Sequence, residues 1–408
     1  MKKTVVVLAT LDTKGEEAAY LREQIESHGG TAKILDLGVV GEAQIEADMG
    51  REDVAVAGGT SITELLDAPT RESAGPVMVS GATKILLELI HSGEAHAVLG
   101  IGGTQGTSSC SQVMQSLPYG FPKLLVSTVA SGDTSPFVGI KDITMMFSVS
   151  DLMGLNSFTK RILANAAAAA YGMSLVEGSV EVGASDKPLI AMTNLGVLTE
   201  GATYAMELLR EAGYEVVVFH AVGSGGRAME QLMKEGVVGA VFDYALGEIA
   251  DDVFGGLRAG GPERLTVAGS LGLPQVICPG GAEHLGLFVE TNVVPEAYEN
   301  HQHVFHSPVI FVPRLNAEEF VQVAEEICRR MQSTRGNAVF MIPLQGVGRY
   351  STPGGPLHDA AGDEAFFGAL REGLPKSVDI LEIDAGAEDP AFIREAVEQL
   401  LGLLAESQ

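Results

Sequence analysis

Hydrophobic residues occur along this chain in short uninterrupted runs, which alternate with longer amphipathic segments. The first half opens with the apolar run of KKTVVVLAT, then a segment in which Leu21 and Ile25 mark one helix face, then a second apolar run. The second half repeats this order from Asp186, with Leu209 on the corresponding helix face. Strand, helix and strand at this spacing predict a βαβ unit in each half, and therefore parallel sheets with right-handed crossovers.

Further apolar runs predict strands, and the amphipathic segments between them predict helices. The runs are continuous rather than alternating, which is typical of strands that are covered on both faces. We expect strands over residues 97–101, 123–129, 143–149, 237–242, 275–278, 309–312, 338–344 and 378–383. We expect helices over residues 70–92, 107–117, 156–172, 227–235, 316–332, 363–372 and 390–405.

A Gly/Ser-rich, acidic segment over residues 174–188 separates the two halves. The fold class we predict is α/β, with two doubly wound, Rossmann-like parallel-sheet domains. Residues 1–180 would form an N-terminal Rossmann-like nucleotide-binding domain and residues 186–408 a C-terminal Rossmann-like domain. Such sheets bind ligands beyond the carboxyl ends of their strands, at a topological switch point. A cleft between two domains is a further favoured place.

Composition narrows the function classes. Lys and Arg number 26 against 53 Asp and Glu, a net charge of −27, which argues against nucleic acid and against an anionic membrane surface as partners. No apolar run approaches the roughly 20 residues of a membrane span, and the N-terminal run is too short for a signal peptide. The three cysteines form no CxxC pair, which disfavours zinc and a disulfide framework. These features predict a soluble, cytoplasmic protein.

The stretch GIGGTQGTSS, at residues 100–109, joins a predicted strand to a predicted helix. It is neither a dinucleotide fingerprint, because Gln105 stands where glycine is required, nor a P-loop, because no Gly-Lys-Ser/Thr follows. A flexible backbone at a helix N-terminus exposes N–H groups that bind anions. A tight turn that needs glycine for packing alone is the alternative. The candidate phosphate-binding residues are Gly102, Gly103, Thr104, Gly106 and Thr107.

Two other strand ends in the first half carry polar side chains. In a parallel sheet all these ends lie on one edge, so we expect three polar loops to converge on a nucleotide. Lys14 would neutralise phosphate, and Asp12 or Asp133 would position Mg²⁺ or, alternatively, cap a helix. The further candidates are Thr10, Asp12 and Lys14 in the first loop and Ser131, Gly132 and Asp133 in the second.

The second half repeats the glycine device in HAVGSGGRAMEQ and adds a long Gly/Pro-rich loop, LQGVGRYSTPGGPLHD, that would act as a lid. Arginines there would bind an anionic substrate, and His220, His284 or His358 would do acid–base work. His301 and His303 lack a third ligand of suitable spacing, so we predict no metal site. The candidate substrate-binding residues are Ser224, Gly225, Gly226, Arg227 and Arg349.

Four long stretches carry a family resemblance: GIGGTQGTSS, SLPYGFPKLLVSTVASGDTSPFVG, DITMMFSVSDLMGLNSFTKRILANAAAAAYGM and PLQGVGRYSTPGGPLHD. Together they resemble an uncharacterised bacterial and fungal family, similar to the ATP-binding inhibitory domain of the tomato mosaic virus resistance protein. The resemblance covers essentially the whole chain. It implies two Rossmann-like subdomains, ATP binding mainly through the first, and a homodimer. In the plant relative a TIM-barrel domain follows, so here a barrel would be a separate partner protein.

Two functions are therefore expected. The first is an ATP-binding protein that holds the phosphates on the GGTQGT loop. The alternative is a metabolic enzyme, of hydrolase or lyase type, that acts on a carboxylated or phosphorylated small molecule in the interdomain cleft.

Overall fold

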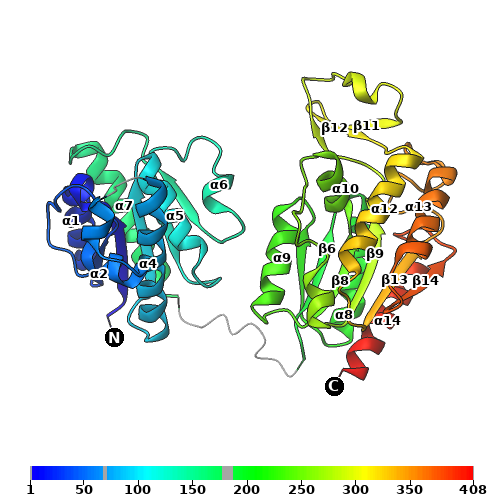
Figure 1. Ribbon diagram of the computed structural model, residues 1–408, viewed down its shortest axis with the longest axis horizontal. Coiled ribbons are helices and arrows are strands. Elements are labelled where there is room, and N and C mark those ends of the chain that lie inside the picture. Colours follow the sequence, from blue (N-terminus) through cyan, green and yellow to red (C-terminus); the bar gives the residue numbers. More distant parts are fainter. Residues whose placement is uncertain (1, 68–70, 177–186, 408) are drawn as a thin grey trace. The chain divides into compact units, whose positions relative to one another are not determined.

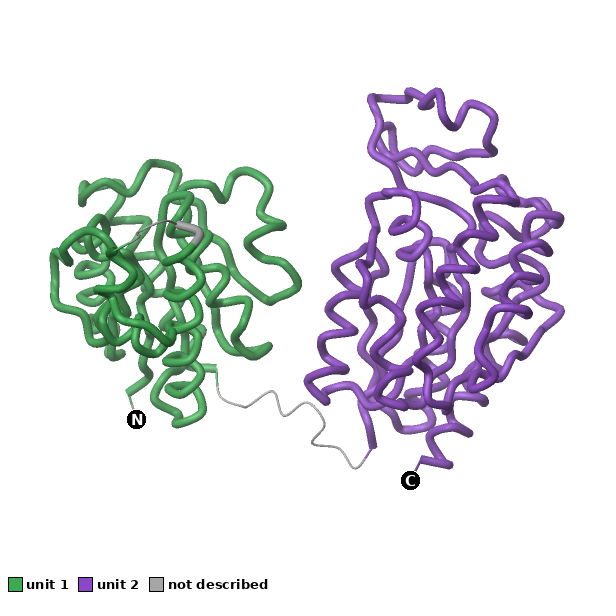
Figure 2. The backbone as a smooth tube through the Cα atoms, in the orientation of Figure 1, with its two compact units in different colours: residues 1–181 green, residues 182–408 purple. Residues whose placement is uncertain are grey.

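The computed structural model describes residues 2–67, 71–176 and 187–407, and the chain divides into two compact units. Unit 1 is Met1–Glu181 and unit 2 is Val182–Gln408 (Figure 1, Figure 2). Of the predicted boundary segment, residues 177–186 lie outside the described residues.

Unit 1 is built on a parallel sheet whose strands follow the order β2-β1-β3-β4-β5. This order reverses direction between β1 and β3, so the topological switch point lies between these two strands. The strands are β1 (Thr4–Ala9), β2 (Thr31–Asp36), β3 (Ala97–Gly102), β4 (Lys123–Ser127) and β5 (Thr144–Phe147). The helices are α1 (Leu11–Ser27), α2 (Arg51–Gly58), α3 (Ile62–Asp67), α4 (Arg71–His91), α5 (Thr104–Gln115), α6 (Ser135–Val138) and α7 (Ser157–Ser174).

Helices cover both faces of this sheet, which is why its strands read as uninterrupted apolar runs. Val5 and Val7 of β1 pack with α1 and α7, whereas Val6 and Leu8 pack on the other face with α4 and α5. Helix α4 is long and apolar enough over Ser73–His91 to cross a membrane, but core helices of soluble proteins can have the same length and composition. It packs against α2 and α5 in the second of these two layers.

Unit 2 has its own parallel sheet, with the same topology as that of unit 1 and one more strand, in the order β7-β6-β8-β9-β13-β14. Its switch point lies between β6 and β8. Helices α8 and α14 cover one face, and α9, α12 and α13 the other. The strands are β6 (Ile190–Asn194), β7 (Val216–His220), β8 (Ala240–Ala245), β9 (Gln275–Gly280), β13 (Ala338–Pro343) and β14 (Val378–Ile383). The helices are η1 (Gly196–Leu198), α8 (Thr199–Glu211), α9 (Ser224–Lys234), α10 (Gly247–Phe254), α11 (Val267–Leu271), η2 (Glu296–Tyr298), α12 (Ala317–Met331), α13 (Ala360–Gly373) and α14 (Pro390–Glu406).

A small antiparallel sheet interrupts this winding between β9 and β13. It contains β10 (Leu287–Phe288), β11 (His303–Ser307) and β12 (Ile310–Pro313), in the order β10-β12-β11 (Figure 1). The strand predicted over residues 309–312 therefore exists but belongs here rather than to the parallel sheet. The prediction was wrong about its sheet because an apolar run does not specify which strands it pairs with, and β12 pairs antiparallel with β10 and β11.

The predicted fold class is confirmed, because both units are α/β and each contains a doubly wound parallel sheet. The winding also fixes where ligands are expected. In each unit a ligand is expected beyond the carboxyl ends of the two strands that flank the switch point: β1 and β3 in unit 1, β6 and β8 in unit 2.

Candidate functional site

A pocket with a volume of about 530 Å³ lies at the switch point of unit 1. Loops that follow β1 and β3 form one side of it, and the segment after β2 and the start of α4 form the other. Its lining residues are Thr10, Asp12, Thr13, Lys14, Leu37, Gly38, Val39, Val40, Ala74, Gly75, Met78, Gly103, Thr104, Gln105, Gly106 and Ser109. The structure thus brings together the first two of the three polar loops singled out in the sequence.

The start of α5 presents unused backbone donors to this pocket. Gly103 is the N-cap and, as a glycine, has no side chain that could accept these N–H groups. The first N–H of the helix with a backbone acceptor is that of Thr107, bonded to the Gly103 carbonyl at 2.8 Å. Within the described residues, the N–H groups of Gly103, Thr104, Gln105 and Gly106 donate to no protein atom. Thr104 and Gln105 are exposed. Four consecutive donors at a helix N-terminus form an anion-binding arrangement.

Gly102 and Thr107 shape this loop from behind. A Cβ on Gly102 would lie 2.6 Å from the Gly106 carbonyl carbon and the Thr107 nitrogen, so no larger residue fits the turn. The buried Thr107 hydroxyl lies 2.7 Å from the Ser127 hydroxyl and donates to the Gly102 carbonyl at 3.2 Å. Of the five loop candidates, Gly103, Thr104 and Gly106 therefore line the pocket. Gly102 and Thr107 do not line it, but their packing and hydrogen bonds fix the conformation of the loop.

The loop after β1 contributes the charged groups of the pocket. Lys14 lines the pocket, and its ammonium group donates to the Leu152 carbonyl at 2.5 Å, which leaves hydrogens for a ligand. Asp12 also lines the pocket and is anchored through its backbone carbonyl, which accepts from Gln44 Nε2 at 2.7 Å. Thr10 completes this set.

A buried carboxylate that sequence reasoning missed supports the loop after β1 and the segment after β2. Asp36, at the end of β2, accepts the N–H groups of Leu11 at 3.0 Å and Gly38 at 2.8 Å. It therefore fixes the start of α1 and the turn that leads into the pocket wall. Burial raises the pKa of this carboxyl above its usual range, and the two N–H groups oppose that shift. An aspartate that ends an apolar strand, as in AKILDLG, is the sequence signal that could have revealed it.

The third predicted loop lies outside the pocket. Ser131, Gly132 and Asp133 are exposed and are absent from its lining. Asp133 accepts the N–H and the hydroxyl of Ser135, at 3.0 and 2.7 Å, and these hydrogen bonds lower its pKa. Its carboxylate thus serves the start of α6, which is the helix-capping alternative. Asp12 is the predicted Mg²⁺-positioning carboxylate that lies at the pocket, and Mg²⁺ bound with phosphates commonly uses one or two protein carboxylates.

In unit 2 the corresponding glycine loop already holds an anion from the chain itself. The Glu248 carboxylate of α10 accepts the N–H groups of Gly223 and Gly226, with donor–acceptor distances of 2.6 and 3.1 Å. A Cβ on Gly226 would collide with this carboxylate. The loop therefore binds a carboxylate as its sequence suggests, but the carboxylate is internal.

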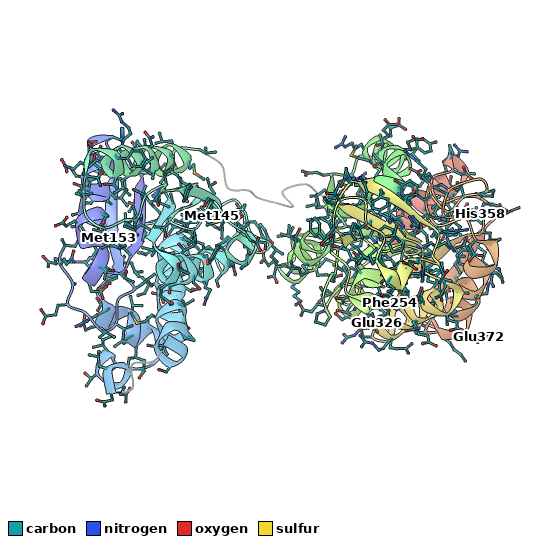
Figure 3. All side chains as sticks on the ribbon, turned by 90° about the horizontal axis from the view of Figure 1, so that it is seen from above. Met145, Met153, Phe254, Glu326, His358 and Glu372 are labelled. Carbon is teal, nitrogen blue, oxygen red and sulfur yellow. The ribbon has the colours of Figure 1, made fainter. Side chains whose placement is uncertain are left out.

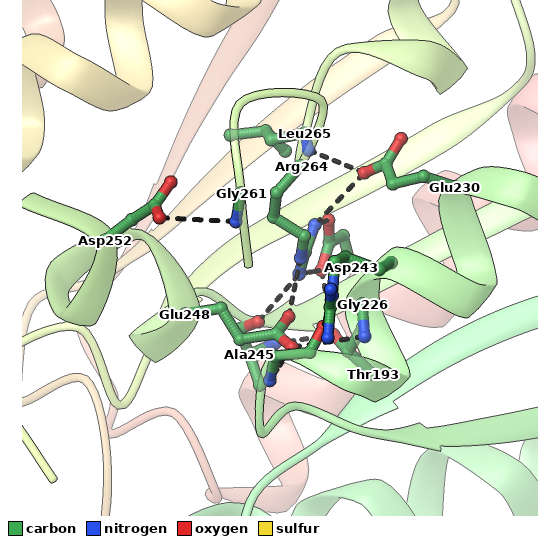
Figure 4. Close-up of polar contacts among 12 residues, drawn as sticks. Thr193, Gly226, Glu230, Asp243, Ala245, Glu248, Asp252, Gly261, Arg264 and Leu265 are labelled. Atoms are coloured by element: carbon green, nitrogen blue, oxygen red, sulfur yellow. Dashed lines mark hydrogen bonds and ion pairs between the residues drawn. The ribbon is translucent and has the colours of Figure 1, made fainter. Parts of the chain in front are cut away.

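Arg264 completes this arrangement from the centre of unit 2 (Figure 4). Its guanidinium is fully buried and contacts Asp243 Oδ1 at 2.6 Å, Glu248 Oε2 at 2.6 Å and Glu230 Oε1 at 3.5 Å. Because Asp243 belongs to β8, Arg264 occupies the region of the switch point that is open in unit 1. Glu230, on the helix that follows the glycine loop, is also buried and accepts the N–H groups of Leu265 and Val267.

The remaining unit 2 candidates lie at the surface. Ser224 and Arg227 are exposed, and Arg227 Nε donates to the Gly223 carbonyl at 3.2 Å. Gly225 packs against the His220 carbonyl so closely that a Cβ would collide with it. Arg349 is ion-paired with Glu388 at 3.0 Å and Glu200 at 2.9 Å. The structure does not gather these residues into one site.

A metal centre is not visible among the described side chains, where no group of three or more His, Cys, Asp and Glu residues could hold an ion. His301 lies 3.0 Å from Glu319 Oε2, and His303 stands on β11 with its Nδ1 3.0 Å from the His301 carbonyl.

Comparisons with known proteins place the whole chain in one family. The N-terminal domain model of the uncharacterised protein family UPF0261 matches residues 3–178, and its C-terminal domain model matches residues 187–404. A UPF0261 protein of Clostridium tetani is 37% identical over 405 residues, which cover 99% of this chain and 100% of that protein. A UPF0261 protein of Rhizobium meliloti is 34% identical over 397 residues, covering 97% and 98%.

More distant likenesses exist as well. The ToMV resistance protein Tm-1(GCR237) of Solanum lycopersicum is 29% identical over 373 residues, which cover 87% of this chain and 49% of the tomato protein. A putative UDP-N-acetylglucosamine 2-epimerase from Listeria monocytogenes is 12% identical with a TM-score of 0.21, covering 68% of this chain and 79% of that one. A score this low carries no argument. Because the two domain models together span nearly every residue, the chain belongs to the uncharacterised protein family UPF0261.

Proposed function

We propose that unit 1 binds ATP at the switch-point pocket, with the phosphates against the start of α5. The observation that carries this proposal is the row of four N–H groups, Gly103 to Gly106, that have no protein acceptor in the described structure and face a pocket of about 530 Å³. Backbone donors suit a nucleotide here because the chain has a net charge of −27 and offers few cations.

The other walls of the pocket suit the rest of the ligand. Leu37, Val39, Val40, Ala74 and Met78 form an apolar side on which a base could lie. Lys14 provides a cation near the amide row, and Asp12 would hold Mg²⁺ against the phosphates. When bound, that ion would neutralise phosphate charge. The family resemblance favours ATP over other nucleotides.

The same resemblance supports a homodimer, which we include in the proposal. We also place the protein in the cytoplasm, because the described cysteines, Cys110, Cys278 and Cys328, are all buried and unbridged. Unit 2 would not share the nucleotide, since Glu248 and Arg264 fill its equivalent loop and crevice.

Calorimetric titration of ATP into Gly103→Val tests this assignment. The nearest atom to a Cβ at Gly103 is the Thr128 hydroxyl at 3.9 Å, so valine is accommodated while its methyl groups add bulk beside the amide row. We expect affinity to fall roughly tenfold or more, the loss from one or more charge-assisted hydrogen bonds.

Ser224→Val is the matched control. Ser224 is exposed and opens α9 at the glycine loop of unit 2, whose N–H groups are taken by Glu248. This variant should bind ATP as the wild type does. If Gly103→Val and the wild type bound ATP with equal affinity, the assignment of the phosphate site to this loop would be wrong.

A further inference from the structure

The apolar wall of the unit 1 pocket that follows β2 is only partly packed against the core. Leu37 is buried, Val39 is partly buried and packs against the core, and Val40 is 68% exposed. All three line the pocket. Because side-chain packing decreases along this stretch, residues 39–41 depend on hydrogen bonds of their backbone for a fixed position.

Arg51, the first residue of α2, supplies these hydrogen bonds. Its Nη1 donates to the Val39 carbonyl at 3.0 Å and also to the Gly41 carbonyl. The two carbonyls lie on either side of Val40 in the sequence. Hydrogen bonds from a charged donor are stronger than neutral ones, so one guanidinium fixes the backbone around the most exposed residue of the wall.

The other hydrogen bonds of residues 37–41, within the part of the chain that the structure describes, lie at the near end of this segment. The Leu37 N–H donates to the last residue of β1 at 2.8 Å, and the Gly38 N–H donates to Asp36 Oδ1 at 2.8 Å. A second pocket, of about 240 Å³, is also lined by Arg51. Open space rather than a packed layer therefore borders this arginine, and the far end of the wall relies on its hydrogen bonds.

The segment that Arg51 holds also lies against the proposed Mg²⁺-positioning carboxylate. A Cβ on Gly41 would lie 2.5 Å from Asp12 Cβ and 2.6 Å from Asp12 Oδ2, so the backbone of Gly41 lies directly against this side chain. A displacement of residues 39–41 would therefore change two sides of the pocket.

Arg51 and Lys14 are cations with different positions relative to the pocket. Lys14 lines it, and its ammonium group is held by Leu152, the neighbour of Met153 that is labelled in Figure 3. Arg51 is not among the described residues that line it, and its Nε donates to Glu52 Oε1 at 3.1 Å. Lys14 can thus reach a ligand, whereas Arg51 acts through the backbone that it holds.

We propose that Arg51 is the positioning residue of the base subsite: it holds residues 39–41 so that the apolar wall receives the flat face of the nucleotide base. This inference rests on the proposed function of unit 1. A planar apolar group binds well only to a surface of fixed shape, whereas the phosphates are held by the amide row of α5. Arg51 therefore contributes to the affinity for a nucleotide and not to the affinity for its phosphates alone.

Calorimetric titration of the full chain with ATP and with inorganic tripolyphosphate, which has no base, tests this role. Arg51→Met keeps the length of the side chain but removes its donors. We expect it to bind ATP roughly tenfold or more weakly than the wild type, and tripolyphosphate equally well. Arg51→Lys keeps a charged donor and should recover part of the lost ATP affinity.

Arg22→Met is the matched control, because it also removes one positive charge from unit 1. Arg22 is paired with Asp48 at 2.5 Å and is not among the described lining residues of the pocket. This variant should bind both ligands as the wild type does. Val40→Ser changes an exposed residue of the wall, so it should fold even if Arg51→Met does not. It should weaken ATP several-fold and leave tripolyphosphate unchanged.

The outcomes separate this inference from the proposed function. A wild-type chain that bound neither ATP nor tripolyphosphate would show that the proposed function itself is wrong. If the wild type bound ATP, and Arg51→Met or, where that variant does not fold, Val40→Ser bound it equally well, only the base subsite would be wrong. An equal loss of ATP and tripolyphosphate affinity in Arg51→Met would also overturn the inference, because it would indicate a general effect on the unit.

Discussion

The Glu248 carboxylate accepts two N–H groups of the unit 2 glycine loop, whereas no side chain that the structure describes accepts the N–H groups of Gly103 to Gly106 in unit 1. The two loops look alike in sequence, so glycine content alone did not distinguish them. What separates them is one glutamate on another helix, with Arg264 behind it. That pairing depends on long-range packing, which the sequence does not display.

Glu230 gives this buried network a pH dependence that can be measured. Burial raises the pKa of Glu230 from its ordinary value of 4.5 to about 7, although Arg264 opposes the shift. Between these pH values the folded chain keeps a proton that the unfolded chain has released. The free energy of unfolding should therefore decrease as pH rises through this window, by on the order of 1–3 kcal/mol, and level off above it.

Glu230→Gln should remove this decrease, because an amide does not titrate. Denaturation by urea at about pH 5 and about pH 7.5 would show it as a smaller difference between the two conditions than in wild type. Glu207→Gln, at an exposed position of α8, is the control and should keep the wild-type difference. A Glu230→Gln variant with the full wild-type difference would show that another group is responsible.

Helices and strands with a clear apolar pattern were predicted close to their observed bounds. Strand β14 runs over Val378–Ile383 as expected, and α12 over Ala317–Met331 is close to the predicted 316–332. Helix α10 was missed because Glu248 and Asp251 are buried on it, matched by Arg264 and Arg258, and so disguise its apolar face. The βαβ pattern predicted parallel strands whose ends share one edge of the sheet. It did not predict the order of the strands, and therefore did not predict that the loops after β1 and β3 would be neighbours.

Helix α7 offers an element whose start can be tested. The Asn156 side chain accepts the N–H groups of Phe158 at 2.9 Å and Thr159 at 3.0 Å. Asn156→Ala removes this cap and should lower the free energy of opening of α7, measured by amide hydrogen exchange, by about 1 kcal/mol. Asn165→Ala, in the exposed middle of the same helix, should leave it unchanged or raise it slightly. Equal protection of α7 in Asn156→Ala and wild type would contradict the capping role.

At the level of the whole chain, charge and architecture point to the same kind of site. A net charge of −27 repels an anionic ligand at long range, so the attraction has to come from donors close to it. Doubly wound sheets provide such donors at their switch point, where helices begin. Both units have this architecture, and the described structure leaves the donors free in unit 1 and occupied in unit 2.

Removing one backbone N–H from unit 1 tests most directly whether amides hold the ligand. Thr104 is the first residue of α5, where proline is well tolerated, and Gly103 before it has an extended ψ of −163° that suits a following proline. Thr104→Pro deletes that donor, while Thr104→Ala removes the hydroxyl and keeps the N–H. Calorimetric titration should show ATP bound roughly tenfold or more weakly by Thr104→Pro than by Thr104→Ala. Equal affinity of these two variants would contradict the account.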